Sequence, residues 1–188
     1  MTKKIMIVGV GGQGTLLASR ILGNTVINEG YDVKVSEVHG MSQRGGSVVT
    51  YVKYGEKVYS PIIGKGEADV ILAFELLEAY RALPYLKKGG KLIVNDQKID
   101  PMPVITGAAS YPENIAEKLS AVCDVTTLDA LSLAKEAGNI KAVNVVLIGV
   151  MARASDIAYE KWVETIKATV PAKFLEINLK AFELGYNL

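Results

Sequence analysis

The segment Lys4-Ile-Met-Ile-Val-Gly-Val-Gly-Gly-Gln-Gly14 decides the fold. Its first seven residues form an almost continuous apolar run, which predicts a strand buried on both faces of a sheet. The glycines that follow have the spacing G-x-G-x-x-G. Apolar residues then recur at helical spacing over residues 15–29, and Gly30 is a stop signal. A buried strand, a Gly-rich turn and a helix are typical of the start of a dinucleotide-binding fold.

The rest of the chain alternates between apolar runs and helical patterns. Strands are predicted at 31–38, 69–74, 91–95 and 125–128, helices at 75–86, 112–122 and 129–137, and a mainly helical segment from 142. The pair Gly89-Gly90 is expected to follow the end of the helix at 75–86. This alternation predicts a doubly wound, mostly parallel sheet. A length of 188 residues suits one domain, residues 1–188.

One stretch interrupts the alternation after the second predicted strand. A crossover helix is expected there, but the sequence has the loop His39-Gly-Met-Ser-Gln-Arg-Gly-Gly46. Residues 47–54 and 57–60 then predict the two arms of a β-hairpin with a turn at Gly55-Glu56. The predicted fold class is therefore α/β, Rossmann-like and doubly wound, with an inserted β-hairpin and a helical C-terminal segment.

Composition excludes several classes of function. The chain has 21 basic and 20 acidic residues, scattered along the sequence, so no charged surface for nucleic acid or membrane is predicted. A single cysteine, Cys123, cannot form an internal disulfide or a four-thiolate metal site, and it is expected to be a small buried side chain. No signal peptide and no run of about 20 apolar residues is visible, which predicts a cytoplasmic protein.

The Gly-rich turn is the first candidate binding element. A residue without Cβ at Gly9 allows a tight turn, at Gly11 it allows close approach to an anion, and at Gly14 it allows helix and strand to pack closely. The helix start that follows offers free N–H groups to a phosphate or carboxylate. The candidate cofactor-binding residues here are Gly9, Gly11, Gly12, Gln13 and Gly14, with Glu37 at the position of a ribose-binding carboxylate. The alternative is a turn that needs glycine only for packing.

The loop at residues 39–46 is the second candidate. It holds the only histidine, and Arg44 offers a planar fork suited to phosphate or carboxylate. Open α/β sheets bind ligands at the carboxyl ends of their strands, where this loop emerges. Further candidate cofactor-binding residues are therefore Ser42, Gln43, Arg44, Gly45 and Gly46, and His39 and Arg44 are candidate catalytic residues of a shared active site. The alternative is a solvated polar loop.

Catalytic groups are otherwise few. The sequence has no second histidine, no Ser/His/Asp set, no metal-ligand cluster and no thiamine diphosphate motif, so His39 and Arg44 stay candidates and no catalytic residue is assigned to this chain alone. A plausible binding pocket with few reactive groups indicates a subunit that completes a site on a partner.

The two glycine-containing segments carry a resemblance. Residues 7–14 (Ile-Val-Gly-Val-Gly-Gly-Gln-Gly) and 37–47 (Glu-Val-His-Gly-Met-Ser-Gln-Arg-Gly-Gly-Ser) resemble the beta subunit family of indolepyruvate ferredoxin oxidoreductase. They are also similar, more distantly, to the gamma subunits of 2-oxoacid ferredoxin oxidoreductases. Further matches lie at 60–64, 68–75, 78–81, 94–95 and 144–149, so the resemblance covers nearly the whole chain.

The resemblance implies a small subunit of a complex that oxidatively decarboxylates an aryl pyruvate to an acyl coenzyme A and reduces ferredoxin. Thiamine diphosphate, magnesium and iron–sulfur clusters are then expected in a large partner subunit, and coenzyme A is a candidate ligand shared with this chain. Two other classes stay open at this point. One is a stand-alone NAD- or FAD-binding oxidoreductase, and the other is a non-catalytic scaffold subunit.

Overall fold

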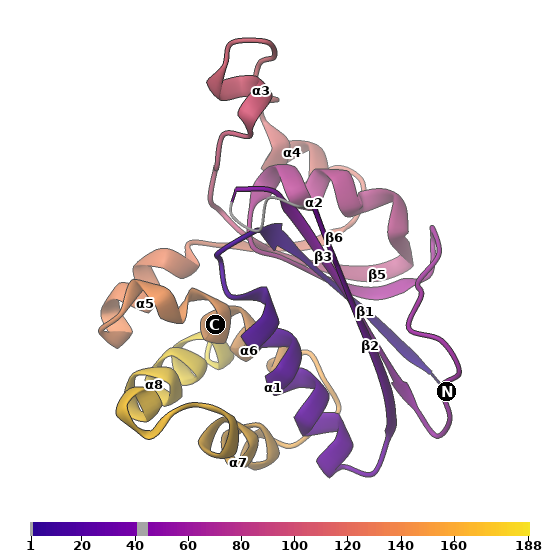
Figure 1. Ribbon diagram of the computed structural model, residues 1–188, viewed down its shortest axis with the longest axis vertical. Coiled ribbons are helices and arrows are strands. Elements are labelled where there is room, and N and C mark those ends of the chain that lie inside the picture. The colour runs from indigo at the N-terminus through magenta and orange to yellow at the C-terminus, as the bar shows by residue number, and fades with distance from the viewer. Residues whose placement is uncertain (1, 41–44) are drawn as a thin grey trace.

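The computed structural model describes residues 2–40 and 45–188. Its centre is a six-stranded sheet in the order β2-β3-β1-β4-β5-β6 (Figure 1). The strands are β1 (Lys3–Val10), β2 (Asp32–His39), β3 (Ser47–Gly55), β4 (Ala68–Ala73), β5 (Leu86–Asn95) and β6 (Asp124–Leu128). The pairs β1–β4, β4–β5 and β5–β6 are parallel, whereas β3 pairs antiparallel with both β1 and β2. The predicted α/β class with a mostly parallel sheet is confirmed.

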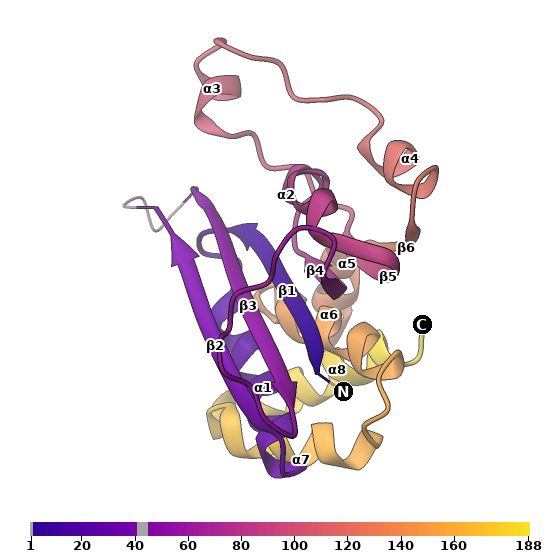
Figure 2. The same cartoon turned by 90° about the vertical axis from the view of Figure 1, so that its right-hand side faces the viewer.

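Helices cover both faces of the sheet (Figures 1 and 2). One face packs against α1 (Thr15–Asn28), α5 (Ala130–Ala137), α6 (Val143–Arg153), α7 (Tyr159–Thr169) and α8 (Leu175–Tyr186). The other packs against α2 (Leu76–Ala82) and α4 (Ile115–Ser120). Alternate residues of β1 enter the two cores, Ile5 and Ile7 the first, Met6 and Val8 the second. The continuous apolar run at the start of the chain is therefore a strand buried on both faces, as predicted.

The inserted hairpin differs from the prediction. Its arms are β2 and β3, which pair antiparallel across residues 40–46, and residues 57–60 form no strand. Both edges of β3 are already occupied, because β1 pairs with its other side. Residues 57–60 therefore cannot pair with β3 as the second arm of a hairpin. The backbone N–H of Val58 instead donates to Asp32 Oδ2 at 2.8 Å.

Other boundaries also moved. The helix predicted to reach residue 86 ends at Ala82, and Pro84 lies in the short 3-10 segment η1 (Leu83–Tyr85) that follows. The Gly89-Gly90 pair lies inside β5 rather than after a helix. Gly90 passes so close to β4 that a Cβ there would lie 2.9 Å from the Ala68 oxygen. Two further 3-10 segments, η2 (Ile140–Ala142) and η3 (Ala172–Phe174), precede α6 and α8.

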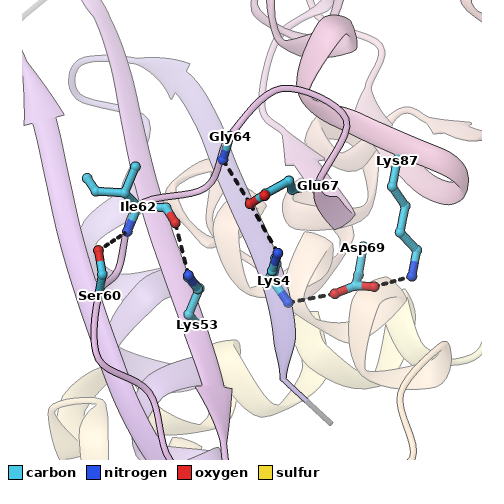
Figure 3. A network of polar contacts seen from close by, with 8 residues as sticks. All are labelled: Lys4, Lys53, Ser60, Ile62, Gly64, Glu67, Asp69 and Lys87. Carbon is cyan, nitrogen blue, oxygen red and sulfur yellow. Dashed lines mark hydrogen bonds and ion pairs between the residues drawn. The ribbon is translucent and has the colours of Figure 1, made fainter.

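The segment after β3 crosses the second face of the sheet and is fastened there by polar contacts (Figure 3). Lys53 Nζ donates to the Ile62 oxygen at 3.0 Å, and Lys4 Nζ contacts Glu67 at 3.0 Å. Asp69 accepts from the Lys4 N–H at 2.7 Å and also pairs with Lys87. This segment covers part of the second face. At the carboxyl end of the sheet, α2 and the loops lie beside the strands instead.

Candidate functional site

The site lies where the carboxyl ends of β1 and β4 meet. The chain leaves β1 into α1 on one face and leaves β4 into α2 on the other face. Adjacent strands whose helices diverge in this way open a crevice at the sheet edge, which is where open α/β sheets bind ligands. The Gly-rich turn and the loop after β2 both reach this crevice.

Gln13 holds the Gly-rich turn in shape. Its Oε1 accepts the Val10 N–H at 2.7 Å, and its Nε2 donates to the Phe74 oxygen at 3.0 Å and to Gln97 Oε1 at 3.2 Å. Asn95, fully buried, donates to the same Phe74 oxygen at 3.1 Å. Both the oxygen and the nitrogen of the Gln13 side-chain amide are thus hydrogen-bonded within the protein. Gln13 therefore stabilises the turn.

The glycines of the turn meet close neighbours. A Cβ at Gly9 would lie 3.0 Å from Phe74 Cβ, so this glycine permits contact with the end of β4. Gly14 has φ of 85°, and a Cβ there would lie 2.7 Å from Asn144 Nδ2. Its close neighbour is therefore α6, and not the strand that the sequence pattern suggested. Gly12, with φ of 101°, has open space around its Cβ position.

The C-terminal end of the loop after β2 is bonded to the turn. The Gly11 N–H donates to the Gly46 oxygen at 2.8 Å, and the Gly45 N–H donates to the Gly11 oxygen at 3.3 Å. The predicted neighbourhood of loop and turn is therefore confirmed at the loop's C-terminal end. The candidates Ser42, Gln43 and Arg44 lie outside the described residues.

A cavity of about 460 Å³ opens on the α1 side of the turn. It is lined by Gly11, Gly12, Gly14, Thr15, Leu16, Glu37, His39 and Val48. Most of the described candidates thus come together, whereas Gly45 and Gly46 line a different cavity on the α2 side. His39 is exposed, and its Nδ1 lies 3.0 Å from the Gly40 oxygen.

The start of α1 suits an anion. Its N-cap residue is Gly14, which has no side chain to accept from the first-turn N–H groups, and that turn contains no acidic residue. Unpaired N–H groups and the helix dipole then favour a phosphate or carboxylate in the cavity. Glu37 is the one carboxylate among the lining residues, on the far side of β3 from β1.

Sequence reasoning missed a cluster of carboxylates on the α2 side. Glu78 is buried, and its carboxylate accepts from Ser47 Oγ at 2.5 Å and pairs with Arg81 at 2.6 Å. Glu75 caps α2 by accepting the Glu78 N–H at 2.9 Å. The signal was present as two glutamates three residues apart at a predicted helix start, a spacing that resembles a capping box.

Glu75 also binds residues far along the chain. Its Oε1 accepts from the Ile99 N–H at 3.0 Å and from the Tyr111 hydroxyl at 2.5 Å. Burial, and then the hydrogen bond to Glu75, raise the pKa of Tyr111 above its ordinary value. No sequence pattern pairs residue 75 with 99 and 111, because that contact depends on the path of the loop after β5.

Within residues 2–40 and 45–188, no group of three or more His, Cys, Asp or Glu side chains is placed to hold a metal ion. None of the described helices has the length and apolar character that a bilayer crossing requires. Cys123 is half-buried just after α4, and burial raises the pKa of its thiol.

Comparison with known proteins places this chain in a family. A model of the pyruvate ferredoxin/flavodoxin oxidoreductase family matches residues 4–188, so the chain belongs to that family. It is similar to the indolepyruvate oxidoreductase subunit IorB of Thermococcus kodakarensis, with 46% identity covering 96% of this chain and 93% of that one. The IorB subunit of Pyrococcus horikoshii is 44% identical over the same shares of the two chains.

Solved structures agree with this assignment. The gamma subunit of a keto/oxoacid ferredoxin oxidoreductase from Geobacter sulfurreducens has a TM-score of 0.73 and 25% identity, covering 98% of this chain and 96% of that one. The pyruvate oxidoreductase subunit PORC of Thermotoga maritima shares the fold, with a TM-score of 0.77 and 19% identity, covering 99% of this chain and 96% of that one. The resemblance drawn from the sequence is confirmed, and so is the role of small subunit in a ferredoxin-dependent oxidoreductase.

Proposed function

We propose that this chain is the small subunit of an indolepyruvate-type 2-oxoacid oxidoreductase and that residues 1–188 act as one cytoplasmic domain. A larger partner subunit holds thiamine diphosphate, magnesium and iron–sulfur clusters and passes electrons to ferredoxin. The identity of 46% to an IorB subunit supports indolepyruvate or a similar aryl pyruvate as the substrate. The complex oxidatively decarboxylates this substrate and forms an acyl coenzyme A.

The role of this chain is to supply one edge of the joint active site. The observation that carries this proposal is the pair of backbone hydrogen bonds between Gly11 and residues 45–46, which join the turn and the loop into one surface. The start of α1 offers N–H groups to an anion there. That anion is a phosphate of coenzyme A or the substrate carboxylate. Arg44 pairs with it, and His39 donates a hydrogen bond.

The test is the kinetics of the reconstituted complex with Arg44→Ala. Loss of a charge-assisted hydrogen bond to a bound anion removes about 1.5 to 3 kcal/mol, which is roughly a tenfold to hundredfold loss in kcat/KM for the oxoacid or for coenzyme A. Arg153→Ala is the matched control, because Arg153 ends α6 at the other end of the sheet and packs over Tyr186. Unchanged kcat/KM for both the oxoacid and coenzyme A would show that Arg44 does not bind the anion.

A stand-alone NAD- or FAD-binding enzyme is the second candidate, favoured by the Gly-rich turn and Glu37 in one cavity. Titration calorimetry of the isolated chain distinguishes it. Fluorescence would report poorly, because Trp162 is fully buried in α7. The third candidate, a non-catalytic scaffold, predicts that loop substitutions change assembly but leave the kinetics of the assembled complex unaltered.

A further inference from the structure

Residues 100–110 form an arm that stands away from the rest of the molecule. In Figures 1 and 2 the chain leaves the end of β5, makes the single turn α3 (Met102–Ile105) at a distance from the sheet, and returns to α4. Met102 and Ile105 expose 64% and 65% of their surface. From residue 101 to residue 112 the sequence has no charged side chain. The tip therefore presents two exposed apolar side chains with no charge in the surrounding segment, which is a candidate interaction surface.

The base of the arm is fixed to the core. Ile99 on the outgoing side and Tyr111 on the returning side both donate to the same oxygen of Glu75, whose side chain is 1% exposed. The Leu76 N–H also donates to the Gln97 oxygen at 3.0 Å, and Lys98 lies 4.6 Å from the centre of the Tyr111 ring. A clamped base reduces the freedom that the arm would lose on binding, which favours association.

The arm is continuous with the candidate active-site edge. A cavity of about 390 Å³ lies between it and α2. The apolar lining of this cavity includes Val10, Leu77 and Met102, and its polar lining includes the Glu78–Arg81 pair. Gly45 and Gly46, which are bonded to the Gly-rich turn, line it as well. A partner that faces the turn therefore also faces the arm.

We propose that residues 100–110 are the docking arm of this chain, whose apolar tip inserts into an uncharged cleft of the larger subunit. Glu75 is the positioning residue that sets the arm's direction. This inference rests on the proposed function in one respect, that the edge at the Gly-rich turn faces the larger subunit. A second copy of this chain fits less well. Met102 and Ile105 alone offer far less than the roughly 800 Å² per partner of a stable interface, whereas the larger subunit also covers the adjoining edge at the Gly-rich turn.

The test measures the Kd between this chain and the purified larger subunit by biolayer interferometry. Met102→Asp and Ile105→Asp each place a charge at the tip and raise Kd roughly tenfold or more, as for residues at the centre of an interface. Both side chains are exposed, so the melting temperature stays at the wild-type value. The matched control is Ile27→Asp, because Ile27 is similarly exposed, at 55%, but lies near the C-terminal end of α1. This variant should bind the larger subunit with the wild-type Kd.

The positioning role of Glu75 has a separate readout. Tyr111→Phe removes the hydrogen bond to Glu75 and also the one that the Tyr111 hydroxyl accepts from the Leu77 N–H. Amide hydrogen exchange at residues 102–109 therefore speeds up several-fold in the isolated chain, and Kd rises less than with the tip variants. Binding of the larger subunit slows exchange at the same residues in the wild type.

Each outcome decides between the proposals. Tip variants that bind like the wild type overturn the docking arm and leave the proposed function standing. The wild-type chain could instead form a dimer that the tip variants dissociate. In that case the arm binds a second copy of this chain, and the choice of the larger subunit as partner is overturned. A wild-type chain that binds no larger subunit overturns the proposed function and the arm together.

Discussion

Two separate structural constraints require glycine at position 14, one from the backbone conformation and one from a close neighbour. Its φ of 85° lies in the left-handed region, and the Asn144 amide occupies the place that a Cβ would take. That amide also donates to the Gly14 oxygen at 3.2 Å, so Asn144 holds the turn while it excludes a side chain. The sequence pattern correctly demanded glycine here, but only the structure identifies the neighbour.

The two constraints can be separated by experiment. Gly14→Ala lowers the free energy of unfolding by about 2 to 4 kcal/mol, as the sum of left-handed strain and overpacking. In an Asn144→Ala background the amide is absent, so the same substitution costs only the strain of about 1 to 2 kcal/mol. Urea denaturation of the four proteins gives both values, and an equal cost in both backgrounds would show that Asn144 does not cause the clash.

Tyr111 gives a prediction in alkaline solution. Its pKa in the folded protein is raised above the ordinary value of 10.0. In this range the folded state binds the phenolic proton more tightly than the unfolded state, so the contribution of Tyr111 to stability is complete below pH 10 and declines above it. The difference in free energy of unfolding between the wild type and Tyr111→Phe is about 1 to 3 kcal/mol at pH 7. It becomes smaller at pH 10.5, and a difference independent of pH would contradict the raised pKa.

At the scale of elements, α6 and α8 cross with their backbones in contact. A Cβ at Gly149 would lie 2.3 Å from the Phe182 oxygen, and one at Gly185 would lie 2.0 Å from the Val146 oxygen. Backbone atoms cannot turn aside, so a larger residue forces the two helices apart. The two glycines therefore set the distance between α6 and α8.

Two substitutions of the same kind should therefore have opposite effects. Gly149→Ala lowers the free energy of unfolding by about 1 to 3 kcal/mol or more, through overpacking. Gly23→Ala in α1 meets only Val35 at 3.9 Å and raises the free energy of unfolding by about 0.5 to 1 kcal/mol, because alanine favours the helix. Thermal and urea unfolding measure both, and a stable Gly149→Ala protein would show that the helices can separate at little cost.

The sequence predicted elements well where the signals were local. The first helix was expected at 15–29 and spans Thr15–Asn28, because its periodicity and its flanking glycines lie within the segment itself. The predicted hairpin of residues 47–54 and 57–60 was wrong, because the pairing of a strand depends on which other strands can reach its edges. β3 pairs with both β2 and β1, and nothing in residues 57–60 reveals that both edges of β3 are taken.

At the scale of the whole molecule, the candidate site could be predicted in part. The turn, Glu37 and His39 share a cavity because parallel strands bring their carboxyl ends to one edge, a rule that needs only the order of elements. Glu75, Tyr111 and the arm escaped prediction because their contacts join segments 24 to 36 residues apart through an irregular loop. The local pattern thus located the edge of the sheet that faces a ligand, but it did not locate Glu75, Tyr111 and the arm beside that edge.

The place of β3 in the sheet predicts how the isolated chain responds to dinucleotides. In a regular dinucleotide-binding fold the ribose carboxylate ends the strand next to β1. Here β3 intervenes, and the register joins Glu37 to Thr50 and Thr50 to Ile7. Two strand spacings put the strand of Glu37 about 10 Å from β1 instead of about 5 Å, so one ligand cannot reach the turn and the carboxylate in the usual way. Calorimetric titration with NADH should show no binding tighter than about 1 mM, which is about −4 kcal/mol. A Kd in the micromolar range that Glu37→Gln weakens would instead support the dinucleotide enzyme.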